Sequence, residues 1–337
     1  MKNQTKAAAQ MLLEKELITE DQFKNIESYH KLHIFSLHTE LRLLLYLSVL
    51  LFTSGIGIII YQNIDTIGHI AILTFILMTI VICFYLCFKN SAAYKNEETE
   101  FTNPIFNYVL LAANLLTCIF IGYLQFQYNV FGTYYGLVTL LPTLIAFFSA
   151  YYFDNRSILS IGLTGLAAYI GLSVSPQVIL SGNLFNIGPP WLSLSAIGLG
   201  VAIILWSMYA EKKHIKTHFQ FVYVTFSFHL ISLAIINNCD GQFWLFAVIA
   251  LFGSVFYFYK ISTKIPAISI FAFNVLYAFF GFNVLLGKLF SVLSIWTDFE
   301  GFWIPLVILS PIYLIISIVL FIKAIKNFNK NKRNENL

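Results

Sequence analysis

Residues 43–60, "LLLYLSVLLFTSGIGIII", are an apolar run without a single charged side chain. A helix of about 20 apolar residues is long enough to cross the hydrocarbon core of a bilayer. Helices suit that environment because each backbone polar group finds its partner within the segment. This run therefore predicts a membrane-spanning helix.

Similar runs recur along the whole chain. Hydrophobic residues make up 58% of the 337 residues and charged residues only 11%, which is far from the usual composition of a soluble domain. The sequence predicts an all-α, polytopic transmembrane helix bundle of about ten spans. The predicted spans are residues 42–61, 69–88, 105–126, 134–152, 157–175, 191–210, 219–237, 243–259, 265–287 and 302–322.

The basic residues are distributed unequally between the two sides of this bundle. If the N-terminus is cytoplasmic, 19 of the 20 Lys and Arg residues fall on the cytoplasmic side, and Lys288 alone falls outside. This distribution follows the positive-inside rule. It predicts an integral membrane protein with both termini in the cytoplasm. The net charge of +4 then reflects orientation, and we expect no nucleic-acid partner.

Residues 5–33, which precede the first run, are typical of two short helices in a small hairpin. Thr19 is a suitable N-cap, and Gln22 stands at the capping-box position three residues later. So small a pair of helices buries too little apolar surface to be stable alone. We therefore expect residues 5–33 to bind a protein partner, a second copy of the chain, or the ends of the spans. The predicted domains are a cytoplasmic helical head (1–40), the transmembrane bundle (41–322) and a basic cytoplasmic tail (323–337).

Polar side chains inside the spans are the strongest functional candidates, because they are costly in lipid. No Asp, Glu, Lys or Arg lies near the middle of a predicted span, which argues against ion-coupled transport. In the third span Asn107, Asn114 and Gln125 form one stripe on the helical wheel, together with Cys118. The stripe predicts either hydrogen bonds to a neighbouring helix, the interpretation we favour, or the wall of a wet path.

The seventh span has a second polar face, formed by Thr225, His229 and Ser232. His229 could act as a proton-sensitive or substrate-binding imidazole. It could also be a neutral histidine bonded to a backbone carbonyl, a Ser, a Thr or an Asn of a neighbouring helix, which we favour.

Small residues and amides predict where helices pack. Gly162 and Gly165 in the fifth span and Gly198 in the sixth belong to stripes of small residues that allow close helix contact. Asn274 and Asn283 in the ninth span are nine residues apart, so we expect them on opposite helix faces.

The segment "YQNIDTIGH" (61–69) predicts a tight outward-facing turn between the first two spans. We expect Asn63 and Asp65 to form the turn and cap the next helix, with Gly68 relaxing the backbone. Both residues are also candidate ligand positions.

The stretches "LITEDQF" (17–23) and "GIGIIIYQNID" (55–65), followed by a second apolar span, resemble the bacterial membrane protein family DUF2157. The resemblance covers residues 8–88. It implies a first span that runs into an Asn-Trp-Asp-like turn, which Asn63 and Asp65 match, whereas Ile64 stands where Trp is common. The resemblance implies the plasma (inner) membrane of a bacterium as the location. It implies no particular activity.

The chain has no phosphate-binding loop, nucleophile elbow or zinc-binding motif. We therefore expect no catalytic residue, no metal site and no cofactor. Two hypotheses remain for the function. The first is a scaffold, sensor or assembly partner acting through its cytoplasmic head. The second is a small-molecule or lipid transporter with a 5+5 helix arrangement, by analogy with transporters built from repeats.

Overall fold

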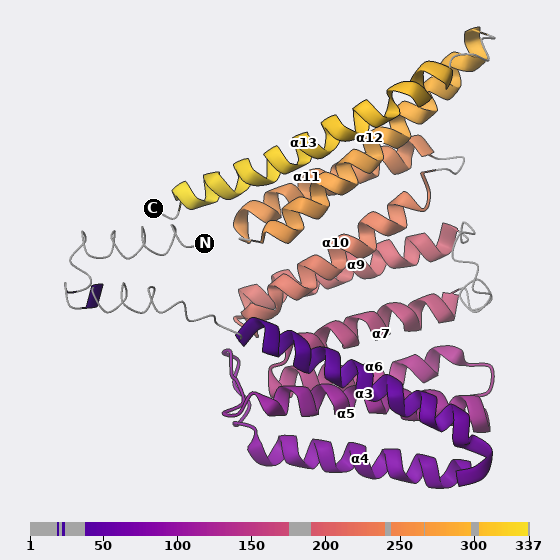
Figure 1. Cartoon of the computed structure of the whole chain (residues 1–337), viewed down its shortest axis with the longest axis vertical. Helices are drawn as coiled ribbons and strands as arrows, with labels where there is room; N and C mark the ends of the chain where they lie inside the picture. Colours follow the sequence, from indigo (N-terminus) through magenta and orange to yellow (C-terminus); the bar gives the residue numbers. More distant parts are fainter. Residues whose placement is uncertain are drawn as a thin grey trace. The chain divides into compact units, whose positions relative to one another are not determined.

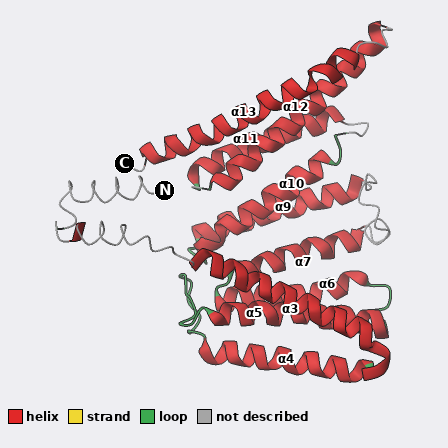
Figure 2. Ribbon diagram, viewed as in Figure 1, coloured by secondary structure: helices red, strands yellow, loops and turns green. Residues whose placement is uncertain are grey.

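Figure 1 shows the computed structural model of the chain. It describes residues 38–174, 190–239, 244–265, 267–297 and 303–335, together with residues 19, 22 and 23. These residues form helices joined by loops, without a strand among them (Figure 2). The elements are α3 (His38–Ile67), α4 (His69–Asn90), α5 (Ile105–Tyr128), α6 (Tyr135–Phe153), α7 (Arg156–Val174), α9 (Pro190–Lys212), the 3-10 turn η1 (Thr217–Phe219), α10 (Gln220–Ile236), α11 (Trp244–Lys264), α12 (Ile268–Thr297) and α13 (Trp303–Glu335).

The ten predicted spans are confirmed, since ten stretches of the described chain are helical, long enough and apolar enough to cross a membrane. The fourth and fifth spans are separate helices, although only Asp154 and Asn155 stand between α6 and α7. Large apolar side chains such as Ile315 on α13 are exposed, as expected of a surface that faces lipid.

The chain divides into two compact units, Met1–Ile56 and Gly57–Leu337. In the first unit the predicted capping box is present. The Thr19 backbone N–H donates to Oε1 of Gln22 at 2.9 Å, and the Gln22 N–H donates to Oγ1 of Thr19 at 3.4 Å. The rest of residues 5–33, apart from Phe23, lies outside the described residues, and the predicted boundaries at 40 and 322 stay predictions.

In the second unit the helices pack mainly against their neighbours in sequence. The pairs α4–α5, α6–α7, α9–α10 and α11–α12 form antiparallel hairpins, and each hairpin contacts the next (Figures 1 and 2). One apolar cluster involves α4 to α7 with parts of α9 and α10, and a second involves α9 to α12. Contacts between α7 and the pair α9 and α10 join the first hairpins to the later ones.

Helices α6 and α7 pack closely, as the glycines of the fifth span predicted. A Cβ on Gly165 would lie 2.1 Å from Oγ1 of Thr143. In the sixth span the prediction for Gly198 was wrong, because that position is open and Gly200 makes the close approach to Ile231. Residues two apart point to opposite sides of a helix, so only one of these glycines can face α10.

The connection between the first two spans is shorter than we predicted. Helix α3 continues through Asn63 and Asp65 to Ile67, so neither residue lies in a loop. Gly68, with a φ of 82°, is the one residue between α3 and α4 and is the N-cap of α4. The correction has a physical reason, because glycine adopts positive φ without the steric cost that other residues meet.

Helix α12 uses its two Asn residues on opposite faces, as their spacing predicts. Asn274 of α12 donates to the carbonyl of Val255 on α11 at 2.9 Å, whereas Oδ1 of Asn283 accepts from the Tyr313 hydroxyl on α13 at 3.1 Å. The two Asn side chains therefore lie on opposite faces of α12. Helix α13 continues through most of the predicted basic tail.

Candidate functional site

A cluster of buried charged groups lies where three loops of the second unit meet. Its centre, Asp154, ends α6 in the left-handed conformation, with φ 58° and ψ 47°. Short polar residues such as Asp adopt this conformation more readily than most. Asn155 then caps α7, because its Oδ1 accepts the backbone N–H groups of Ser157 at 3.0 Å and Ile158 at 3.1 Å.

The Asp154 carboxylate is fully paired. It accepts the backbone N–H of Thr99 at 2.7 Å, lies 3.0 Å from Nζ of Lys216, and binds Nε2 of His218 through its other oxygen. The Asp154 side chain has no exposed surface, and that of Lys216 is 1% exposed. We call Thr99, Asp154, Lys216 and His218 the Asp154 cluster. Buried charges such as these are tolerated only when they are paired and hydrogen-bonded.

Lys216 joins the cluster to the loop that follows α4. Its backbone has a φ of 45°, its N–H donates to the carbonyl of Asn96 at 3.1 Å, and its Nζ donates to the carbonyl of Glu97 at 3.4 Å. The ammonium also lies 5.2 Å from the ring centroid of Tyr94. The loops before α5, between α6 and α7, and before α10 are therefore held together at one end of these helices.

The amides predicted as a stripe on α5 have separate roles. Oδ1 of Asn107 accepts from Nδ2 of Asn155 at 3.0 Å. Because Asn155 caps α7, this bond ties α5 to the start of a neighbouring helix, which is the kind of contact we favoured. Asn114 instead donates to the carbonyl of Leu110 in its own helix at 2.9 Å. The prediction of interhelical bonding was therefore wrong for Asn114, because its NH2 group is bound by the preceding turn of α5, while its Oδ1 is buried without a hydrogen-bond partner among the described residues.

Gln125 binds the loop that follows α5 rather than a neighbouring helix. Its Nε2 donates to Oδ1 of Asn129 and to the carbonyl of Gly132, and its Oε1 accepts the N–H of Phe131, each at 2.9 Å. The prediction of an interhelical bond was wrong here too. Gln125 fixes a connecting loop, and this role follows from its place in the last turn of α5.

The polar face of the seventh span is only partly brought together. Thr225 and His229 of α10 line a groove of about 350 Å³, which Ser160 of α7 also lines. Nδ1 of His229 lies 2.8 Å from the hydroxyl of Tyr277 on α12. Its partner is therefore a Tyr rather than the backbone carbonyl, Ser, Thr or Asn that we expected. Ser232 is fully buried and does not line that groove.

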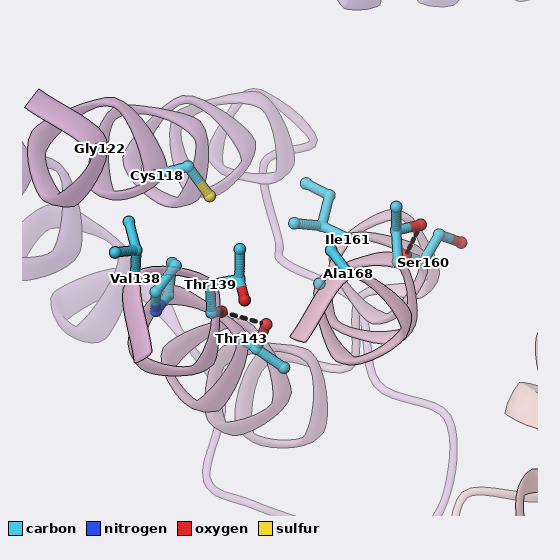
Figure 3. Close-up of a pocket in the computed structure, with 11 residues that line it drawn as sticks. Cys118, Gly122, Val138, Thr139, Thr143, Ser160, Ile161 and Ala168 are labelled. Carbon is cyan, nitrogen blue, oxygen red and sulfur yellow. Dashed lines mark hydrogen bonds between the residues drawn. The ribbon is translucent and has the colours of Figure 1, made fainter. Parts of the chain in front are cut away.

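A second groove, of about 540 Å³, lies between α5, α6 and α7 (Figure 3). Cys118 of the predicted α5 stripe lines it, and Ser160 contributes to this groove as well as to the one beside α10. The third and seventh spans thus line two grooves that have one wall residue of α7 in common.

Neither Asn63 nor Asp65 can be placed in a site, because their side chains lie outside the described ones, and both stay predictions. Among the residues that the structure describes, no three His, Cys, Asp or Glu side chains gather as they would to hold a metal ion.

The fold defines the protein as a polytopic integral membrane protein of α-helices. Residues 10–159 match the family described as "Predicted membrane protein (DUF2157)". The resemblance seen in the sequence is thereby confirmed, and the match extends through the turn that contains Asp154. No curated protein and no solved structure matches the chain.

Proposed function

We propose that the protein is a membrane scaffold, sensor or assembly partner, in which the bundle supports a cytoplasmic head that binds another protein or a second copy. The observation that supports this most is that polar side chains of the spans form hydrogen bonds with other residues of the chain itself. Asn107, Gln125 and His229 are bound by neighbouring residues of the bundle. They stabilise a fixed arrangement of helices and loops, as a support requires.

The proposed topology puts the head on the same side of the membrane as the Asp154 cluster. If each of the ten helices crosses the membrane once, the head and the loops that contain Thr99, Asp154 and Lys216 lie on the same side. The basic residues favour the cytoplasm as that side, in the inner membrane of a bacterium. A cysteine introduced at exposed Lys95 should then react with a membrane-impermeant maleimide only after the cells are opened.

Deletion of residues 1–37 tests the role of the head and leaves α3 whole. We expect proteins cross-linked to the full chain in cells to be lost from the truncated chain, while membrane fractionation shows unchanged insertion. The same set of cross-linked proteins from both chains would contradict the proposal.

The second candidate is a transporter of a small molecule or lipid, with five helices in each half. It is favoured by the two grooves that share Ser160, because together they involve the third and seventh spans. The variant His229→Leu, which changes the wall of the groove beside α10, tests it in proteoliposomes that contain labelled lipids. Unchanged movement of every lipid that the unaltered chain moves would contradict this path.

A further inference from the structure

The polar groups that line the groove between α5, α6 and α7 are hydrogen-bond acceptors. Figure 3 shows Cys118, Thr139 and Ile161 around the space between the three helices. The groove lies near the middle of these spans, since Cys118, Thr143 and Gly165 are central in α5, α6 and α7. A ligand here would lie at membrane depth.

Each of the four hydroxyl groups of the wall already donates a hydrogen bond to a backbone carbonyl. Thr139 donates to the carbonyl of Gly136 at 2.8 Å and Thr143 to that of Thr139 at 2.6 Å. On α7, Thr164 donates to the carbonyl of Ser160 at 2.8 Å, and Ser160 donates to the residue one turn before it at 3.1 Å. A hydroxyl whose proton is committed still offers lone pairs, so each of these oxygens can accept from a ligand.

A proline in the same wall adds another acceptor. Pro142 lies inside α6 and has no N–H, so the carbonyl of Val138 lacks its usual intrahelical partner. Val138 and Pro142 both line the groove. The Cys118 thiol is only a weak donor. The polar part of the wall therefore presents several acceptors and no strong donor.

We infer that this groove binds a membrane-dissolved molecule with an apolar body and an uncharged hydroxyl group, of the class of long-chain alcohols. The hydroxyl would donate to the acceptors of α6 and α7, whereas an ether or ketone of the same shape could not. No charged side chain lines the groove, and a charged ligand group would be costly at this depth. The volume of about 540 Å³ is in the range of small-molecule sites.

One glycine of the wall allows the groove to be filled without a clash. A Cβ on Gly122 of α5 would meet no atom within 4 Å, so Gly122→Phe can place its ring in the groove. Gly253→Phe is the matched control, because Gly253 on α11 is equally open, is exposed and does not line the groove. Gly165 is unsuitable for this purpose, since its Cβ would meet Thr143.

The binding test uses the full chain in nanodiscs and a photoreactive hexadecanol, with plain hexadecanol and its methyl ether as competitors. We expect saturable labelling of peptides that contain Cys118 or Thr139. The alcohol should compete about fivefold better than the ether, as expected for the gain of one neutral hydrogen bond. Gly122→Phe should abolish saturable labelling, and Gly253→Phe should leave it unchanged.

The isosteric variant Thr164→Val removes an acceptor oxygen and keeps the shape of the wall, so it also covers the case in which Gly122→Phe fails to fold. We expect it to reduce the preference for the alcohol over the ether and to leave competition by the ether unchanged. Equal competition by the two molecules in the unaltered chain would overturn the inference. Labelling that survives in folded Gly122→Phe would overturn it as well.

Discussion

Asp154 is the residue at which the turn between α6 and α7 meets the loop before α5 and the segment before α10. Its carboxylate is bound by a backbone N–H from the loop before α5, by Lys216 and by His218. A buried ion pair adds little stability relative to an apolar pair of the same shape. Loss of one partner is more damaging, because the remaining charge is then buried without compensation.

Lys216→Met should therefore lower the free energy of unfolding by about 3–5 kcal/mol, since it leaves the Asp154 carboxylate buried and without its ammonium partner. Arg156→Met is the matched control, because the side chains of Arg156 and its partner Glu98 are both 51% exposed. An exposed pair contributes about 1 kcal/mol or less. Denaturant unfolding in detergent micelles measures both changes, and equal losses would refute the structural role of the Asp154 cluster.

The sequence could reveal the members of this cluster but not their association. Asp154 and Lys216 lie in short polar segments that the charge pattern places on one side of the membrane. Nothing in that pattern pairs residues so far apart in the chain. The partner of His229 was missed for a similar reason, since Tyr277 is one of 19 Tyr residues and marks no position by itself.

At the scale of the helices, hydropathy predicted the ten spans. A segment that crosses lipid must be a long apolar helix, because its backbone polar groups find hydrogen-bond partners only within the segment. The spacing of Thr19 and Gln22 predicted the capping box, which depends only on residues close in sequence. The connection around Asn63 was predicted less well. Polar residues between two apolar runs favour a turn, but they also extend a helix beyond the span, and Gly68 alone decides where α3 ends.

The α6–α7 hairpin should be the helix pair most sensitive to added volume. Gly165→Ala places a methyl group against Oγ1 of Thr143 in a tightly packed contact and should cost about 1–3 kcal/mol. Gly198→Ala adds the same group at an open, exposed position of α9 and should be neutral or stabilising by up to about 1 kcal/mol. Thermal unfolding in one detergent compares the two, and a greater loss at Gly198 would contradict the packing described.

At the scale of the whole molecule, the second unit is a series of hairpins in which each helix packs mainly on its neighbours in sequence. Such an arrangement fits the proposed scaffold role, because each hairpin is held in place by its contacts with the neighbouring hairpins. Two grooves of this unit share Ser160 as a wall residue, one between α5, α6 and α7 and one beside α10. Function through the head and function through a path in the bundle therefore depend on different parts of the chain.

Quantitative cross-linking in cells separates these two parts most directly, with the full chain, the chain without residues 1–37, and the variant Asn114→Leu with His229→Leu compared at equal membrane abundance. We predict that removal of the head abolishes the cross-linked partners and that the double substitution keeps them. Partners that persist without the head, or that are lost only when the two polar side chains of the bundle are replaced, would contradict the account.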